Sequence, residues 1–443
     1  MAERWEHIER VATPAIVPQF GALSGVRVLL TGSVVAAPFA ATILAEQGAE
    51  VIHVERPNVG DAYRLQSPQL MLSGDKSKPF MLAGPEVPSD KKVSAAWANE
   101  GRNKLSLALE VNMKIPESKE IFLSLIKNCD IWLENMVWTE KLGITEELVF
   151  QVNPKIIIAH VSGFGRPQFG GTPEDCDRGS YDPIGQAESG WMHLNGWPDR
   201  PPSYGGSFVS DYMTAMFAVS GIMFAYVDML KTGKGQAIDV TQIESMSKTM
   251  CDTFVNYNTL GMVKTRAGNK LPIFQPADLF QSKDGYVYIA TFGQTVYERT
   301  LRAMDISPEE FPYFEAGASR EAINSELGLK LDQRVKEWAL ARTSEEACEH
   351  LKKHKIPCAI TRTAKDLSES KHYASRDNWI EYKDETLGQT IKAFSFAPKM
   401  SRSKQQVWRG APMLGQDTSL VLNKIAGYSD SEIAAFKSKG VIG

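Results

Sequence analysis

The sequence predicts an α/β protein with a large domain built on a doubly wound parallel sheet and a smaller α+β domain. Three observations support this prediction. Apolar runs of strand type alternate with helical stretches through residues 26–165, as in βαβ units. A segment with hairpin character follows, and α/β patterning returns near the end of the chain. The 443 residues also exceed the length at which a single core normally stops growing.

The first strand is expected at Val26–Thr31 and the second at Val51–Val54, with a tight turn and a helix between them. Both are unbroken runs of the kind that form buried parallel strands. Further strand-like runs, separated by the helical or turn-forming stretches "PESKEIFLSLIKN" and "TEELVFQVNP", are Leu105–Val111, Cys129–Asn135 and Lys155–Gly165. Residues 57–100 contain five prolines among charged residues and glycines, which predicts a long surface excursion.

The stretch Tyr212–Val227 carries no charge and is shorter than the ~20 residues that span a bilayer, so we expect a buried helix. Further along, "FQSKDGYVYIATF" predicts an antiparallel hairpin, and "IPCAITRT" predicts a strand. "YSDSEIAAFKSKG" predicts a helix with a capping box made by Ser429 and Glu432. The large domain is therefore expected to be discontinuous, at residues 1–235 and 341–443, with the small domain at residues 236–340.

The charge balance argues against nucleic-acid binding, because 49 basic and 53 acidic side chains give a net charge of −4 without a strongly basic stretch. The first twenty residues mix charges into their sequence and lack the apolar core of a signal peptide. Five scattered cysteines form no C-x-x-C pair, which fits reduced thiols. We therefore expect a cytoplasmic protein that binds neither membrane nor nucleic acid.

Several common chemistries lack their sequence motifs. The turn "TGSVVAAP" keeps one glycine where a dinucleotide fingerprint needs three, which disfavours a nicotinamide or flavin enzyme. Cys348, His350, His354 and Cys358 fit an amphipathic surface helix running into a strand better than a zinc site, so no metal is expected. His160, inside a strand-like run, is expected to be a hydrogen-bonded core histidine.

Asp211 stands at the start of the long apolar helix, and two interpretations remain open for it. It is either a cap, because a helix N-terminus offers unpaired N–H groups to an anion, or a reagent. A carboxylate that is ionised at neutral pH can attack a thioester carbonyl without a general base. The oxyanion that forms then needs donors, from the same helix start or from a nearby glycine-rich loop.

Five motifs occur in order along nearly the whole chain: "GVRVLLTGSVVAAPFAATILAEQGAEVIHVERPNVGDAYR", "SGFG", "SYDPIGQAESGWM", "SDYMTAMFAVSGIMFAYVDMLKTGKGQAIDVTQIESM" and "QVWRGAPMLGQDT". Together they resemble the family III CoA-transferases, in particular the carnitine and bile-acid CoA-transferase branch. The resemblance implies a Rossmann-like large domain and makes Asp211 the nucleophile. CoA would move from an acyl-CoA to a free carboxylic acid through an aspartyl mixed anhydride and an aspartyl-CoA thioester.

The resemblance also implies which residues bind CoA, which is a substrate here rather than a tightly bound cofactor. Arg56, in "VERP", matches a nucleotide-contacting arginine of the family. "EGRNKLS" supplies Arg102, Asn103 and Lys104, and "ENMVWTEKLG" supplies Asn135 and Lys141. This last segment is two residues shorter than the family's pattern and lacks its Pro-Gly. The assembly implied is an interlocked homodimer, with a heteromer containing a paralogous subunit as the alternative.

Two alternatives within the family are an acyl-CoA racemase and a partner subunit of a heteromeric transferase. The racemases use a histidine in a "G-H-D" segment, where this chain has Tyr181 followed by Asp182. A tyrosine with an ordinary pKa is a poor base at pH 7, so Asp182 is expected to be structural. The sequence leaves two interpretations of Trp191, Trp197 and Tyr204, which either line a substrate pocket or pack in a core. It also does not identify the acceptor acid, which is a carnitine-type, bile-acid-type or aryl-succinate-type molecule.

Overall fold

The computed structural model describes residues 13–136 and 139–443. The first twelve residues, on which much of the signal-peptide argument rests, and Val137 and Trp138 of the segment "ENMVWTEKLG" lie outside the described residues. The chain divides into two compact units. The first contains the chain up to Trp191 together with residues 205–251 and 377–443, and the second contains residues 192–204 and 252–376.

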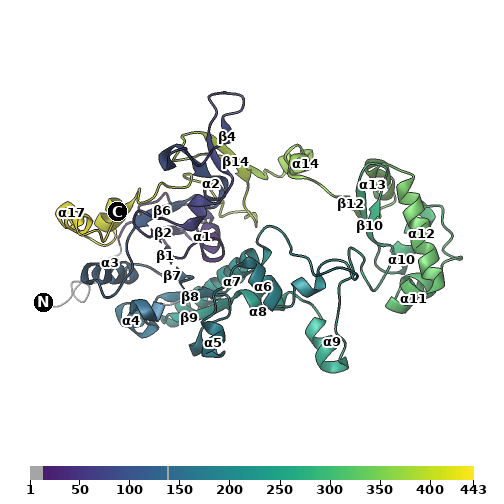
Figure 1. The fold of residues 1–443 in the computed structure, drawn as a ribbon, viewed down its shortest axis with the longest axis horizontal. Coiled ribbons are helices and arrows are strands. Elements are labelled where there is room, and N and C mark those ends of the chain that lie inside the picture. The colour runs from purple at the N-terminus through teal and green to yellow at the C-terminus, as the bar shows by residue number, and fades with distance from the viewer. Residues whose placement is uncertain (1–12, 137–138) are drawn as a thin grey trace. The chain divides into compact units, whose positions relative to one another are not determined.

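The first unit is built on a six-stranded sheet in which every neighbouring pair of strands is parallel (Figure 1). Along the sheet the order is β6-β2-β1-β7-β8-β9. Numbered by their order along the chain, these six strands therefore lie side by side in the order 3-2-1-4-5-6, which is the doubly wound Rossmann order. The predicted fold class is thus confirmed. The strands are β1 (Arg27–Thr31), β2 (Glu50–Glu55), β6 (Lys104–Ala108), β7 (Ile131–Glu134), β8 (Ile157–Ser162) and β9 (Gln236–Thr241).

Helices cover both faces of this sheet because strand side chains alternate between two apolar cores. Leu29 and Trp132 enter one core, while their neighbours Val28 and Leu133 enter the other. Helices α3 (Pro116–Lys127), α4 (Glu146–Val152), α16 (Thr418–Lys424) and α17 (Asp430–Ser438) contribute to the first core. Helices α1 (Ala36–Glu46) and α7 (Val209–Thr232) contribute to the second. The capping box predicted for α17 is confirmed.

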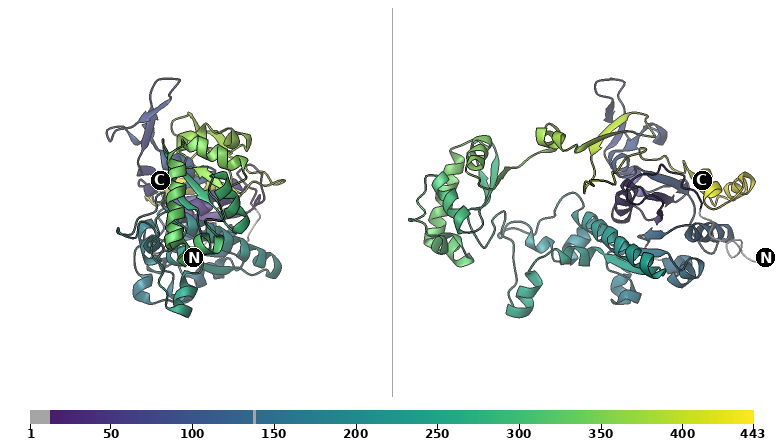
Figure 2. Two further views of the ribbon diagram at one scale, coloured as in Figure 1. Left: turned by 90° about the vertical axis from the view of Figure 1, so that its right-hand side faces the viewer. Right: turned by 180° about the vertical axis from the view of Figure 1, so that it is seen from behind.

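Helix α7 buries only one of its faces, whereas the sequence predicted a buried helix. Small residues at helical spacing, including Ala215 and Ala218, pack with the alanine-rich α1 over the sheet (Figure 2, right panel, long teal helix). The other face is open, with Phe224 and Leu230 among its exposed side chains. At 24 residues α7 is long and apolar enough to cross a membrane by length and composition alone, and 28% of its most apolar window is buried in this chain.

The excursion at residues 57–100 has structure of its own. Tyr63, Val93 and Trp97 pack with Val35 and Ala411 in a small apolar cluster, and this packing orders the segment. Its strands form an antiparallel sheet in the order β4-β3-β5. The elements are η2 (Ala62–Leu65), β3 (Gln69–Leu72), β4 (Phe80–Leu82), η3 (Ser89–Lys91), β5 (Val93–Ser94) and α2 (Ala95–Glu100).

Shorter elements complete the first unit. After β7 and β8 come η4 (Thr139–Leu142), η5 (Pro167–Phe169), α5 (Pro173–Cys176) and α6 (Asp182–Glu188). Helix α8 (Gln242–Lys248) follows β9 directly, and β13 (Trp379–Lys383) pairs with β14 (Thr390–Phe394) as a hairpin. The C-terminal segment, yellow in Figure 1, returns beside β6, where Ile442 bridges to Leu109.

The second unit contains the antiparallel hairpin predicted from "FQSKDGYVYIATF", formed by β10 (Ala277–Gln281) and β11 (Tyr286–Ala290), with β12 (Cys358–Ile360) beside it. Its helices include α9 (Thr253–Leu260), α10 (Gln294–Ala303), α12 (Glu326–Leu340) and α13 (Ser344–Lys353), with the shorter α11 (Arg320–Asn324), α14 (Ala364–Ser368) and α15 (Lys371–Ser375). The unit boundaries differ from the expected domain limits. Strand β9 continues the parallel sheet, so residues 236–251 fall in the first unit, while β12 pairs with β11, so residues 341–376 fall in the second.

Candidate active site

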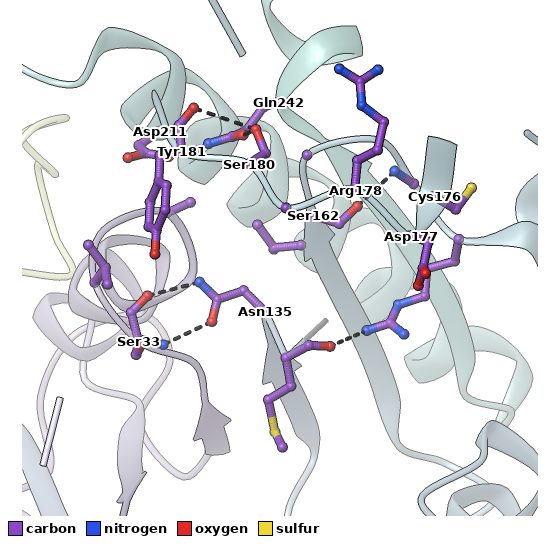
Figure 3. Close-up of a pocket in the computed structure, with 18 of the residues that line it drawn as sticks. Ser33, Asn135, Ser162, Cys176, Asp177, Arg178, Ser180, Tyr181, Asp211 and Gln242 are labelled. Atoms are coloured by element: carbon purple, nitrogen blue, oxygen red, sulfur yellow. Dashed lines mark hydrogen bonds between the residues drawn. The ribbon is translucent and has the colours of Figure 1, made fainter. Parts of the chain in front are cut away.

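A pocket of about 520 Å³ opens at the carboxyl ends of the parallel strands in the first unit. Ser33 follows β1, Asn135 follows β7, Ser162 ends β8 and Gln242 follows β9, and all four line the pocket (Figure 3). The strand order reverses between β1 and β7, which is the place where doubly wound sheets bind ligands. The topology alone thus favours this pocket as the active site.

Asp211 lies in the first turn of α7 and lines the same pocket, although only 8% of the residue is exposed. It does not cap its helix. The cap is Asp182 of α6, whose Oδ1 accepts the backbone N–H groups of Ser210 at 2.7 Å and Asp211 at 3.3 Å. Asp182 Oδ2 accepts a further hydrogen bond, from Gln186. Of the two interpretations that the sequence left open for Asp211, a helix cap or a reagent, the structure therefore disfavours the cap. Asp182 has the structural role expected for it.

The backbone that leads into α7 is strained. Ser207 and Phe208 both have left-handed backbone conformations, with φ of 63° and 52°. A bulky side chain at positive φ is uncommon and persists where the surrounding structure enforces it, often near functional sites. Helices α6 and α7 also approach closely, since a Cβ added at Gly185 would lie 2.2 Å from Ser210 Oγ. This packing brings Asp182 of α6 to the start of α7.

The environment of Asp211 disfavours its charged form. Burial is the main cause and raises the pKa of Asp211 to about 7. A hydrogen bond of 2.5 Å from Gln242 Nε2 to Asp211 Oδ1 opposes the rise, and the negative charges of Asp182 and Glu100 add to it. Burial therefore makes the neutral form of Asp211 more favourable near pH 7 than in a free aspartate, contrary to the expectation that this carboxylate is fully ionised there.

The opposite wall of the pocket is formed by the turn between β1 and α1. Asn135 holds this turn, because its Oδ1 accepts from Ser33 N at 2.8 Å and its Nδ2 donates to Ser33 O at 2.9 Å (Figure 3). Val34 adopts a φ of 70°, and its N–H donates to Asp61 Oδ1. Helix α1 then begins at the pocket, with no side-chain cap from Val35. Its first N–H groups can therefore serve an anion in the pocket, whereas Asp182 already occupies those of α7.

Comparison with known proteins identifies the family. The model of CoA-transferase family III matches residues 23–418. The chain belongs to this family. It is 32% identical over 429 residues to the bile acid CoA-transferase BaiK of Clostridium scindens, a match that covers 96% of this chain and 90% of BaiK. As a family III CoA-transferase, the protein is an enzyme whose substrates are CoA thioesters, rather than one that uses a tightly bound cofactor.

Solved structures support the same fold. A CAIB/BAIF family protein from Brucella suis superposes with a TM-score of 0.75 at 23% identity, covering 92% of this chain and all of that one. Rv3272 from Mycobacterium tuberculosis superposes with a TM-score of 0.73 at 20% identity, covering 91% of this chain and 99% of its own. At such low identity these similarities bear on the fold alone.

Of the residues expected to bind CoA, Asn135 lies in the pocket of this CoA-transferase together with Asp211. Arg56 directly follows β2, so it lies at the same edge of the sheet. Its side chain is 71% exposed, and Nε lies 3.6 Å from Glu110 Oε2. Lys141 is exposed in η4, next to Glu140 of the pocket wall. Arg56 and Lys141 do not themselves line the pocket.

Arg102, Asn103 and Lys104 do not fit the expected role of binding CoA phosphates. They precede or begin β6, and the start of a parallel strand lies at the edge of the sheet opposite to the pocket. All three are buried. Their polar groups already bind protein atoms: Arg102 pairs with Glu46, Asn103 binds the backbone of Gln406 and Trp408, and Lys104 Nζ donates to Thr42 and to the Glu100 carbonyl. These contacts anchor α1 and the C-terminal segment.

The core histidine, the cysteine–histidine segment and the three aromatic residues considered from the sequence lie outside the pocket that contains Asp211. His160 is buried, and its Nδ1 lies 2.5 Å from Glu134 Oε1, as expected for a core histidine. Cys348 Sγ lies 3.5 Å from Cys358 Sγ, and no group of three or more metal-binding side chains occurs among the described residues. Trp191, Trp197 and Tyr204 do not line the pocket that contains Asp211.

Two residues near the Asp211 carboxylate were not identified from the sequence. Gln242 binds the carboxylate directly, and the Ser180 hydroxyl donates to Gln242 Oε1. One signal was available, because Gln242 comes immediately after the strand-like run "AIDVT" of β9, and such positions face the ligand in a parallel sheet. The contact itself joins residues 31 positions apart and follows from the packing of α7 against α8.

Proposed function

We propose that the protein transfers CoA from an acyl-CoA to a free carboxylic acid, with Asp211 as the nucleophile. One observation carries the proposal: the Asp211 carboxylate lines the pocket at the point where the strand order reverses, and a different residue caps its helix. Asp211 Oδ2 makes no hydrogen bond to any described residue, so it is available to a substrate.

The proposed reaction exchanges one thioester for another. An oxygen of Asp211 attacks the thioester carbonyl of the donor, the C–S bond of the tetrahedral intermediate breaks, and CoA leaves as a thiolate, which gives an acyl-aspartyl anhydride. The thiolate then attacks the Asp211 carbonyl of that anhydride, which releases the donor acid and leaves an aspartyl-CoA thioester. An acceptor carboxylate attacks this thioester, and the thiolate finally attacks the acceptor acyl carbon. Asp211 returns as a carboxylate, and the cycle consumes no water or ATP.

The pocket offers hydrogen-bond donors for the oxyanion of each tetrahedral intermediate. The uncapped start of α1 lies in the wall formed by Val35 and Ala36, across from Asp211. Backbone N–H groups at a helix start stabilise a developing negative charge at low reorganisation cost. Asn135 acts indirectly, because its two hydrogen bonds to Ser33 fix the turn that leads into α1. For the nucleotide end of CoA we propose the exposed cations Arg56 and Lys141.

The racemase alternative is not favoured. Racemisation at the carbon next to a thioester carbonyl needs two proton-transferring groups, one on each side of that carbon. Tyr181 occupies the position of the racemase histidine, and the neighbouring carboxylate of Asp182 is engaged by the start of α7 and by Gln186. A buried carboxylate with these hydrogen bonds is not free to accept a substrate proton.

We propose a homodimer with interlocked chains as the assembly. The proposal is supported by large apolar side chains that remain exposed together on one helix of each unit, since clustered exposed apolar residues mark interaction surfaces. On α7 they are Met216, Phe224, Val227 and Leu230, and on α9 they are Phe254, Val255, Tyr257 and Leu260. A heteromer with a paralogous subunit would cover the same surfaces, and purification of the chain expressed alone separates the two assemblies.

A transfer assay tests the proposed function. Purified enzyme is incubated with one acyl-CoA and a panel of free acids, and formation of new acyl-CoA esters is followed by mass spectrometry. Bile acids are the first acceptors to test, because the relative BaiK carries that name. Asp211→Asn, assayed promptly to avoid deamidation, is expected to lose at least 10³-fold in kcat. Asp228→Asn, on the exposed part of the same helix, is the matched control. Full activity of the Asp211→Asn enzyme would contradict the proposal.

A further inference from the structure

Gln242 makes the one side-chain hydrogen bond to Asp211 among the described residues. Its Nε2 donates to Asp211 Oδ1 at 2.5 Å, and both residues are buried. At its other end, the amide Oε1 accepts a hydrogen bond from the Ser180 hydroxyl. An ionised carboxylate can only accept, so the amide must present its NH₂ group to Asp211, and the Ser180 hydroxyl holds the amide in that orientation.

The surroundings leave Gln242 little freedom to turn away. A Cβ added at Gly185 would lie 2.9 Å from the Cβ of Gln242, so α6 packs directly against this side chain. Gln242 is also the first residue of α8, whose Thr241 cap accepts the backbone N–H of Glu244. The base of the side chain is thus fixed by a capped helix and its tip by two hydrogen bonds.

We propose that Gln242 is a positioning residue that holds Oδ1 of Asp211 and so presents Oδ2 to the acyl carbon of the substrate. This inference rests on the proposed function and adds to it the residue that orients the nucleophile. A free carboxylate rotates about its Cβ–Cγ bond and offers either oxygen. Fixing one oxygen by a short, charge-assisted hydrogen bond keeps the other in a single place, which is the ordering that near-attack geometry requires.

Gln242 has a second effect on the same carboxylate, because the charged groups that face Asp211 are themselves negative. Asp182 approaches from α6 and Glu100 from α2, and both raise the Asp211 pKa, while the hydrogen bond from Gln242 lowers it. Arg166 and Arg178 also line the pocket, but their guanidinium groups bind Glu134 and Glu188. Removal of Gln242 would therefore leave a buried carboxyl facing two carboxylates without its hydrogen-bond donor, and its pKa would rise further.

The test replaces Gln242 with leucine and, as a second variant of similar length, with methionine. The Asp211 carboxylate band is followed by infrared difference spectroscopy between pH 5 and 10, with Asp211→Asn as the subtracted reference. The expected result is an upward shift of the Asp211 midpoint by about 1 pH unit. Ser180→Ala should shift it in the same direction by less, because the amide keeps its donor but loses its orientation. Gln236→Leu, at an exposed glutamine of β9, is the control.

Kinetics supply a second readout. At pH 6.5 the Gln242→Leu enzyme is expected to lose at least 10-fold in kcat with an unchanged KM for the acyl-CoA, and to recover part of that loss at pH 9. A folded Gln242→Leu and Gln242→Met pair whose infrared midpoints match the wild type would overturn this inference alone. A wild-type enzyme that exchanges no CoA would instead overturn the proposed function, and the infrared titration would still show whether Gln242 binds the carboxylate.

Discussion

The carboxylate of Asp182 accepts the backbone N–H groups of Ser210 and Asp211, and it thereby performs the capping role that the sequence position of Asp211 suggests for Asp211 itself. The carboxylates of Asp182 and Asp211, both near the start of α7, thus have separate roles. One satisfies the orphan donors of the helix, and the other stays available at the pocket. The division also has an electrostatic consequence, because the charge of Asp182 helps to raise the pKa of Asp211.

Replacing Asp182 with alanine should destabilise the protein by about 1–2 kcal/mol, because the buried N–H groups of Ser210 and Asp211 lose their acceptor. Asp182→Asn keeps an acceptor oxygen at the same place and should retain most of the stability. It should also lower the Asp211 midpoint, since a negative charge is removed. Urea unfolding followed by circular dichroism measures the first effect. An alanine variant as stable as the wild type would show that the cap contributes nothing.

The acylation step should depend on pH through the ionisation of Asp211. Since burial raises the pKa of Asp211 to about 7, the reactive carboxylate is scarce below pH 6 and predominates above pH 8. The single-turnover rate of acylation should therefore rise about tenfold for each pH unit below 7 and level off above it. Stopped-flow measurement between pH 5.5 and 9 tests this. A rate that stays constant down to pH 5.5 would mean that Asp211 has an ordinary pKa.

Substitution of Arg56 should affect substrate binding, whereas substitution of Arg102 should affect stability. Arg56 is exposed at the carboxyl end of β2, so Arg56→Ala should raise KM for acyl-CoA about 10-fold with little change in kcat or stability. For an acyl-pantetheine substrate, which lacks the nucleotide, the same variant should have the KM of the wild type. Arg102→Ala should instead destabilise the fold by about 3 kcal/mol, because it leaves Glu46 buried without its partner. An unchanged KM in Arg56→Ala would remove Arg56 from the CoA site.

The proposed assembly predicts that the exposed face of α7 lies in a subunit interface. Wild-type enzyme should sediment as a dimer at micromolar concentration. The double substitution Phe224→Glu and Leu230→Glu places two charges on that face without touching the buried alanines, and it should shift the population toward monomer. Lys231→Glu, on an exposed residue of the same turn, is the control. A wild-type chain that sediments as a monomer would contradict the proposal.

The parallel sheet was predictable because its strands are buried on both faces and read as continuous apolar runs, such as Val26–Thr31 and Val51–Val54. Strand β9 was harder to place. Its sequence looks like an ordinary short strand after a turn, and only pairing with β8 shows that it extends the same sheet. The β12 strand raised the converse difficulty, since pairing with β11 assigns it to the second unit.

The candidate active site was predictable only where a sequence motif identified a residue. Asp211 and Asn135 were named from motifs, and both line the pocket. Arg102 and Lys104 were expected to bind CoA from the family resemblance, but both are buried and bind protein atoms. Their buried partners Glu46 and Thr42 lie on α1, more than 50 residues away in the chain. A local sequence pattern cannot predict pairs of residues so far apart in the chain. The contact between Gln242 and Asp211 was not predictable for the same reason.

Chemical capture of the acyl-aspartyl and aspartyl-CoA intermediates tests most directly whether Asp211 is the nucleophile. Enzyme is incubated with acyl-CoA and hydroxylamine, digested and examined by peptide mass spectrometry. A hydroxamate is expected on Asp211, dependent on acyl-CoA and absent from Asp182 and Asp228. Transfer activity that proceeds at the normal rate while hydroxylamine leaves Asp211 unmodified would contradict the proposed covalent role of Asp211.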